Sequence, residues 1–102
     1  MKFENWLFGK DGALFRAAAQ GKMDLARELV SLGANVNAAS KSGFTPLHRA
    51  SQNGHADIVR FLVDAGANPA AESRDRKTPL MLATDSGHGE IAAFLRRRIA
   101  RT

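Results

Sequence analysis

Three glycines, Gly21, Gly54 and Gly87, stand 33 residues apart, and the residues around them repeat with the same spacing. A fixed period of about 20 to 50 residues is typical of stacked supersecondary units, in which each unit packs mainly against its neighbours. Such a stack offers an extended binding surface more readily than a catalytic pocket. The recurring residues are a leucine, an alanine and an acidic residue: Leu14, Leu47 and Leu80; Ala17, Ala50 and Ala83; Asp24, Asp57 and Glu90.

The middle unit has clear signals for two short helices. Thr45 is suited to cap the start of the first helix, and Pro46 suits its first position, where the missing N–H is not needed. Gly54 would end this helix in the left-handed conformation. Asp57 favours the start of a second helix, where a carboxylate interacts well with the helix dipole, and Gly66 would end it. The pattern therefore predicts an all-α fold built from helix-turn-helix units.

The string Gly43-Phe44-Thr45-Pro46-Leu47-His48, followed by Gly54-His55 and by Gly66-Ala67-Asn68, resembles an ankyrin repeat. The third unit is similar to it, and the first unit is more degenerate but keeps Gly21 and the segment Gly33-Ala34-Asn35-Val36-Asn37. The resemblance spans residues 11 to 99. It implies one domain, an ankyrin-type solenoid with β-turn or hairpin connections. The expected parts are a cap segment at 1–10 and three repeats at 11–42, 43–75 and 76–102.

Two departures from the repeat pattern fall in repeat three. Arg76 stands where repeat two has Gly43, and Met81 replaces the histidine found at position 48. If the turn at Arg76 needs a positive φ, arginine costs on the order of 1 kcal/mol there. The closing Gly-Ala-Asn is also missing, as expected of a terminal repeat that faces water. At the other end, Phe3, Trp6 and Leu7 share one helical face, which predicts a short helix that shields repeat one.

The excess of basic residues lies at the C-terminal end. The net charge is +5, and +1 remains when Arg96, Arg97, Arg98 and Arg101 are left out. The charge therefore predicts no nucleic-acid-binding face along the whole stack. The arginine cluster leaves three interpretations open: a solvated helix end, a site for an acidic partner or anionic membrane, or a nucleic-acid contact or localisation signal.

No residue pattern predicts catalysis, a metal site or a cofactor. By the resemblance, His48 is expected to hydrogen-bond the backbone of a neighbouring loop. His55 and His88 should lie about 10 Å apart in adjacent repeats, whereas ligands of one metal lie about 2 Å from the ion. The chain has no cysteine, which excludes disulfides and favours a cytoplasmic location. We find no apolar run long enough for a membrane span and no secretory signal.

The resemblance implies that a partner contacts the loop tips and the exposed side of each first helix. Phe44 is the best anchor candidate, with packing against the adjacent hairpin as the alternative. Repeat one would add Asp11, Ala19 and Gln20. The predicted partner-binding positions are Lys41, Ser42, Phe44, Gln52 and Asn53 in repeat two, and Arg74, Asp75, Lys77, Asp85 and Ser86 in repeat three.

We therefore predict a protein–protein interaction module of the adaptor, regulatory or inhibitor type. A rigid scaffold would present unlike side chains at regular spacing on its concave face, with little ordering cost on binding. The predicted partner is another protein, and the chain is expected to be a monomer, with self-association left open. The alternative is a binder of anionic surfaces, nucleic acid or membrane, that works through the C-terminal arginines.

Overall fold

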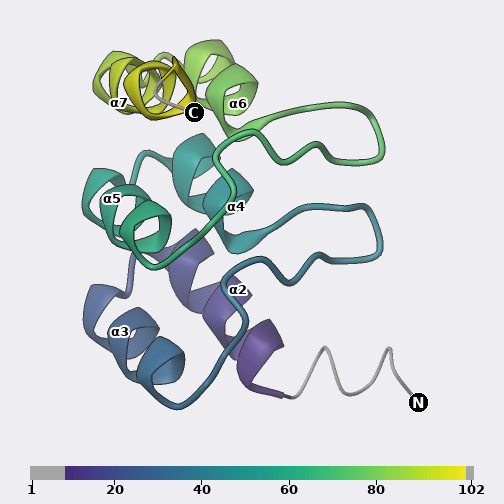
Figure 1. Cartoon of the computed structure of the whole chain (residues 1–102), viewed down its shortest axis with the longest axis vertical. Helices are drawn as coiled ribbons and strands as arrows, with labels where there is room; N and C mark the ends of the chain where they lie inside the picture. Colours follow the sequence, from purple (N-terminus) through teal and green to yellow (C-terminus); the bar gives the residue numbers. More distant parts are fainter. Residues whose placement is uncertain (1–8, 101–102) are drawn as a thin grey trace.

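The computed structural model describes residues 9–100, which form three antiparallel helix pairs stacked in one direction (Figure 1). The predicted all-α solenoid is confirmed. No strand occurs within these residues. The first helices of the pairs are α2 (Lys10–Gln20), α4 (Pro46–Asn53) and α6 (Pro79–Asp85). The second helices are α3 (Met23–Ser31), α5 (Ala56–Asp64) and α7 (Gly89–Ala100).

The helices form two layers, with α2, α4 and α6 in one and α3, α5 and α7 in the other (Figure 1). The segments 32–45 and 65–78 connect successive pairs and project beyond the first helices. We call them the first and second finger loops. The two boundaries proposed between repeats, after residues 42 and 75, fall inside these loops and stay predictions. The predicted cap segment 1–10 lies almost wholly outside the described residues.

The predicted helix signals of repeat two are confirmed. The Thr45 side chain accepts a hydrogen bond from the backbone N–H of His48, and Pro46 occupies the first turn. Gly54 ends α4 with φ 82°, in the left-handed region where glycine has no steric cost. Thr78 caps α6 in the same way by accepting from the N–H of Met81. The Thr-Pro pair thus sets where both first helices begin.

The core lies between the two layers and runs through all three repeats. The largest fully buried side chains include Leu14, Leu47, Ile58, Leu62 and Leu95. Alanines at the recurring position of the first helices have almost no exposed surface, which lets the helices approach closely. The large apolar side chains exposed in the described residues are those of the two end repeats: Leu25, Leu32 and Met81.

Residues at equivalent positions of the 33-residue period are not all equally buried. Leu25 is 40% exposed, although its counterparts Ile58 and Ile91 are buried. Leu80, the counterpart of Leu14 and Leu47, is only partly buried. Both differences have one cause, since an end repeat of the described stack has a neighbour on one side only.

Histidine side chains join each repeat to the one before it. The Nε2 of His55 donates to the carbonyl oxygen of Ala19 at 3.1 Å. One repeat later, the Nε2 of His88 donates to the carbonyl oxygen of Gln52 at 3.1 Å. Each ring packs on the glycine that ends the preceding first helix, and a Cβ on Gly54 would lie 2.7 Å from the His88 ring. These glycines are needed for space as well as for their backbone conformation.

His48 makes the opposite link, from repeat two forward to repeat three. Its Nδ1 accepts from the backbone N–H of Thr45 at 3.1 Å, so Nε2 carries the proton and donates to the carbonyl oxygen of Lys77 at 2.8 Å. The predicted bond to a neighbouring loop is therefore confirmed. The imidazole is fully buried, and this burial lowers its pKa below the usual 6.5, with a further contribution from the Arg49 charge. Hydrogen bonds to the backbone at Lys77 and Ala71 oppose the lowering of the pKa without cancelling it.

The lowered pKa of His48 predicts a loss of stability in mild acid. Below pH of about 6.5 the unfolded state takes up the proton more readily than the folded state, so the free energy of unfolding falls as the pH drops toward the folded-state pKa. Urea unfolding followed by circular dichroism should show a lower midpoint near pH 5 than near pH 7. An NMR titration of the His48 ring should give a midpoint below 6.5, and a midpoint at or above that value would contradict the prediction.

Arg76 is the one non-glycine residue with a positive φ in the described part of the chain, at 64°. The sequence comparison with Gly43 anticipated this conformation. Its side chain is exposed and lies 3.8 Å from Glu72, an exposed ion pair that contributes little to stability. The strain of the left-handed conformation, about 1 to 2 kcal/mol, is therefore almost uncompensated.

We expect Arg76→Gly to leave stability unchanged or to raise it by up to about 1 kcal/mol, because glycine removes the strain. The gain is partly offset by the greater freedom of glycine in the unfolded chain. The measurement is the urea midpoint against wild type. Arg74→Gly is the matched control: it lacks the strain and should lower the midpoint or leave it unchanged. A clear loss of stability in Arg76→Gly would mean that the arginine makes an essential contact.

Candidate functional site: the inner face and the finger loops

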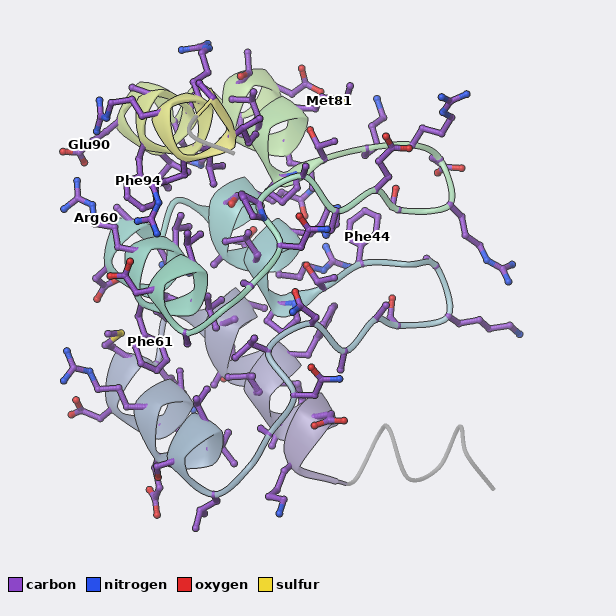
Figure 2. The ribbon with its side chains drawn as sticks, in the orientation of Figure 1. Phe44, Arg60, Phe61, Met81, Glu90 and Phe94 are labelled. Carbon is purple, nitrogen blue, oxygen red and sulfur yellow. The ribbon has the colours of Figure 1, made fainter. Side chains whose placement is uncertain are left out.

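The candidate surface consists of the exposed side of α2, α4 and α6 together with the tips of the finger loops, and we call it the inner face. The other surface, formed by α3, α5 and α7, we call the outer face. Phe44 lies on the side from which the finger loops project, whereas Arg60, Phe94 and Glu90 lie on the opposite side (Figure 2).

The predicted binding positions lie on the inner face in two groups. The finger-loop group is Lys41, Ser42, Phe44, Arg74, Asp75 and Lys77; the helix-end group is Gln52, Asn53, Asp85 and Ser86. All are exposed except Phe44 and Gln52, which are half-buried. The two groups are separated by the length of a short first helix, about 12 Å for eight residues. Whether a partner contacts them stays a prediction.

Some predicted positions already have partners within the fold. The Asn53 side chain donates to the carbonyl oxygen of Ala19 at 2.8 Å and so joins repeats one and two. The Phe44 ring stacks on His48 with a centroid distance of 5.2 Å. Asp11, a predicted position of repeat one, lies in the first turn of α2 and accepts from the N–H of Asn35 at 2.8 Å.

The finger loops hold their tips in a fixed relation to each other. In each loop a tight turn is closed by backbone bonds, from Ser40 N–H to the Phe44 carbonyl and from Ser73 N–H to the Lys77 carbonyl. Between the loops, the N–H of Arg74 donates to the Ser42 carbonyl at 2.9 Å. A surface with its backbone fixed in this way loses little conformational freedom on binding.

The finger tips are positively charged. Arg76 belongs to this surface as well, although the sequence reasoning treated it only as a departure from the repeat pattern. Arg76 has a carboxylate partner in Glu72 at 3.8 Å, and both side chains are largely exposed. The charged side chains at the tips are four cations, Lys41, Arg74, Arg76 and Lys77, against two carboxylates, Glu72 and Asp75.

Arg49 lies in the middle of the inner face, between the two predicted groups, and sequence reasoning missed it. Its guanidinium carbon is 5.0 Å from the ring centroid of Phe44 and 5.7 Å from that of Phe15. One of its terminal nitrogens donates to the Gln52 side chain at 2.8 Å. Three elements, α2, α4 and the first finger loop, thus fix one arginine in place.

The outer face carries a second series of arginine–phenylalanine contacts, each between adjacent repeats. Arg27 lies 6.0 Å from the Phe61 ring, and Arg60 lies 5.7 Å from the Phe94 ring. Arg60 also meets Glu90 at 3.8 Å (Figure 2). Because both arginine and phenylalanine recur after 33 residues, the contact repeats.

The C-terminal arginines do not act alike. Arg98 stacks on Phe94 at 5.5 Å and donates to Asp64 at 3.0 Å, so it fastens α7 to α5. Arg96 and Arg97 are exposed. Arg101 lies outside the described residues. Beside Arg96, an open hollow of about 200 Å³ is lined by Thr84, Gly87, His88, Gly89 and Ala92.

The described residues contain no group of histidine, cysteine and acidic side chains placed to hold a metal ion. None of the helices within residues 9–100 is long and apolar enough to span a membrane.

The geometry agrees with comparisons against known proteins. A family model described as ankyrin repeats, with three copies, matches residues 14–101. A search among curated proteins found no significant match.

Proposed function

Since the chain belongs to the ankyrin repeat family, whose members are generally protein–protein interaction modules and typically non-enzymatic, we propose that it binds a protein partner through its inner face and finger loops. Its role would be that of an adaptor, regulator or inhibitor, which acts by occupying a surface of the partner.

One observation above all supports this proposal: scaffold positions repeat between units, whereas most of the predicted binding positions do not. Thr45 and Thr78 both cap helices, and His55 and His88 both join repeats. At the tips and helix ends the residue types change from one repeat to the next. The paired positions are Lys41 and Arg74, Ser42 and Asp75, Phe44 and Lys77, Gln52 and Asp85, Asn53 and Ser86. A constant frame with varied surface residues suits recognition of one partner.

Affinity purification from the source cells, with quantitative mass spectrometry, tests the proposal. The inner-face variant is Arg74→Ala with Lys77→Ala, whose side chains are exposed. The matched control is Lys22→Ala with Arg27→Ala, which removes the same charge from exposed positions of repeat one. We expect a protein retained at high salt by wild type and control, and lost from the inner-face variant. Partners that bind the inner-face variant as well as they bind wild type would contradict the proposal.

A second candidate function is binding to an anionic surface, nucleic acid or membrane, through the C-terminal end. The exposure of Arg96 and Arg97 on consecutive positions of α7 favours it. Arg98 contributes less, because Asp64 already neutralises it. Binding of this kind would weaken steeply with salt and would be lost in Arg96→Ala with Arg97→Ala, while the inner-face variant would behave as wild type.

A further inference from the structure

Arg49 has an unusual setting for a surface arginine. Its guanidinium lies against two aromatic rings, Phe44 at 5.0 Å and Phe15 at 5.7 Å, and the residue is half-buried. Aromatic contacts of this kind restrict the planar group and shield part of it from water. Arginine has five N–H donors, and Gln52 accepts from one of its terminal nitrogens. The guanidinium is therefore held in place, and Gln52 is the side-chain acceptor that it has among residues 9–100.

On the outer face, arginines that contact a phenylalanine ring can also form an ion pair with a carboxylate. Two arginines contact Phe94, and each also meets a carboxylate: Arg60 with Glu90 at 3.8 Å and Arg98 with Asp64 at 3.0 Å. Arg49 has its aromatic contacts but no salt bridge within the described part of the chain. Arg27 also lacks one there, but it is exposed to water, whereas Arg49 is half-buried.

The charge around Arg49 would attract an acidic group. Arg16 occupies the position equivalent to Arg49 on the neighbouring α2. The finger tips hold four cations against the two carboxylates of Glu72 and Asp75, and at the opposite end of the inner face Asp85 is exposed. A surface with an excess of one charge raises the encounter rate of a partner with the opposite charge and disfavours partners with the same charge.

On the premise that the inner face binds a protein, we propose that its partner is an acidic segment, with one aspartate or glutamate side chain paired to Arg49. The carboxylate would meet the edge of the guanidinium in the forked geometry that arginine offers and lysine does not. The finger-tip cations would contact further acidic residues of the same segment. Arg49 is then the specific anchor, and the finger tips supply attraction at longer range.

The test uses a phage-displayed library of random linear peptides, panned on the wild-type protein. We expect the selected peptides to be enriched in aspartate and glutamate. The affinity of a selected peptide is then measured by fluorescence anisotropy with wild type, Arg49→Lys and Arg27→Lys. Arg49→Lys keeps the charge but loses the fork, so we expect at least about a tenfold weaker affinity. Arg27→Lys, the control on the outer face, should bind as wild type does.

A second measurement leaves the protein unchanged and so does not depend on how a variant folds. Each acidic residue of the peptide is replaced in turn by its amide. At one position this replacement should weaken the affinity by the same factor as Arg49→Lys does. Combined with Arg49→Lys, the same change should cause little further loss, because the two groups interact with each other.

Three outcomes would overturn the proposal. The first is a set of selected peptides that fail to bind the Arg74→Ala, Lys77→Ala variant but are not enriched in acidic residues. The inner face would then bind protein, but not through acidic segments. The second is acidic peptides that bind Arg49→Lys as well as wild type. The third is a labelled oligothymidine whose binding requires Arg49 and displaces the peptides, which would assign the face to nucleic acid. If all selected peptides bind the inner-face variant as tightly as wild type, the result would contradict the proposed function as well.

Discussion

Leu62→Ala will lower the free energy of unfolding by about 2 to 5 kcal/mol, the range for removing a large apolar side chain from a packed core. Leu62 is fully buried in α5 and belongs to the core that runs through all three repeats. A domain of this size has a total stability of only about 5 to 15 kcal/mol. The variant should therefore be largely unfolded at moderate urea concentrations. Leu47→Ala, also fully buried, should behave similarly.

Urea unfolding followed by circular dichroism provides the measurement, and Leu32→Ala is the matched control. Leu32 is 57% exposed, so the same chemical change should cost within about 0.5 kcal/mol. Equal losses for Leu62→Ala and Leu32→Ala would contradict the assignment of Leu62 to the core.

Gly43→Ala is expected to cost about 2 to 4 kcal/mol, from two effects that add. Gly43 has φ 84°, which strains any residue with a Cβ by about 1 to 2 kcal/mol. The added Cβ would also lie 2.9 Å from the backbone nitrogen of Arg74, in the second finger loop. That atom is held by its bond to Ser42 and cannot move aside without breaking the contact between the loops.

Gly66→Ala separates these two effects. Gly66 also has a positive φ, 106°, but a Cβ there would meet no atom within 4 Å. Its urea midpoint should reflect the backbone strain alone and lie between those of wild type and Gly43→Ala. If both variants lose the same stability, the close approach of the two finger loops is not a source of strain.

The sequence predicted the fold well because local signals and the period agreed. Thr45 and Thr78 begin first helices, and Arg76 has the positive φ that its alignment with Gly43 implied. The ends were harder to predict, because the period treats Leu25 and Ile58 as equivalent. Only the stack shows that Leu25 has no neighbouring repeat on its open side within the described residues.

The candidate site was predicted less completely, for a different reason. Spacing along the chain places a residue on a helix face but does not say which distant side chain reaches it. Arg49 meets Phe15 across 34 residues, and Asp11 caps a backbone N–H 24 residues away. The sequence feature that could have identified Arg49 as a site residue is its positive charge on the exposed side of α4. The cytoplasmic location stays a prediction.

The links between repeats make the middle repeat the best-protected part of the chain. It reaches back to repeat one through Asn53 and His55 and forward to repeat three through His48. Local opening should therefore begin at the outer repeats, and amide hydrogens of α4 and α5 should be the last to exchange with solvent. Arg49 and Phe44 both lie in this slowest-opening unit, so the centre of the inner face would stay assembled while the two ends of the stack fray and re-form.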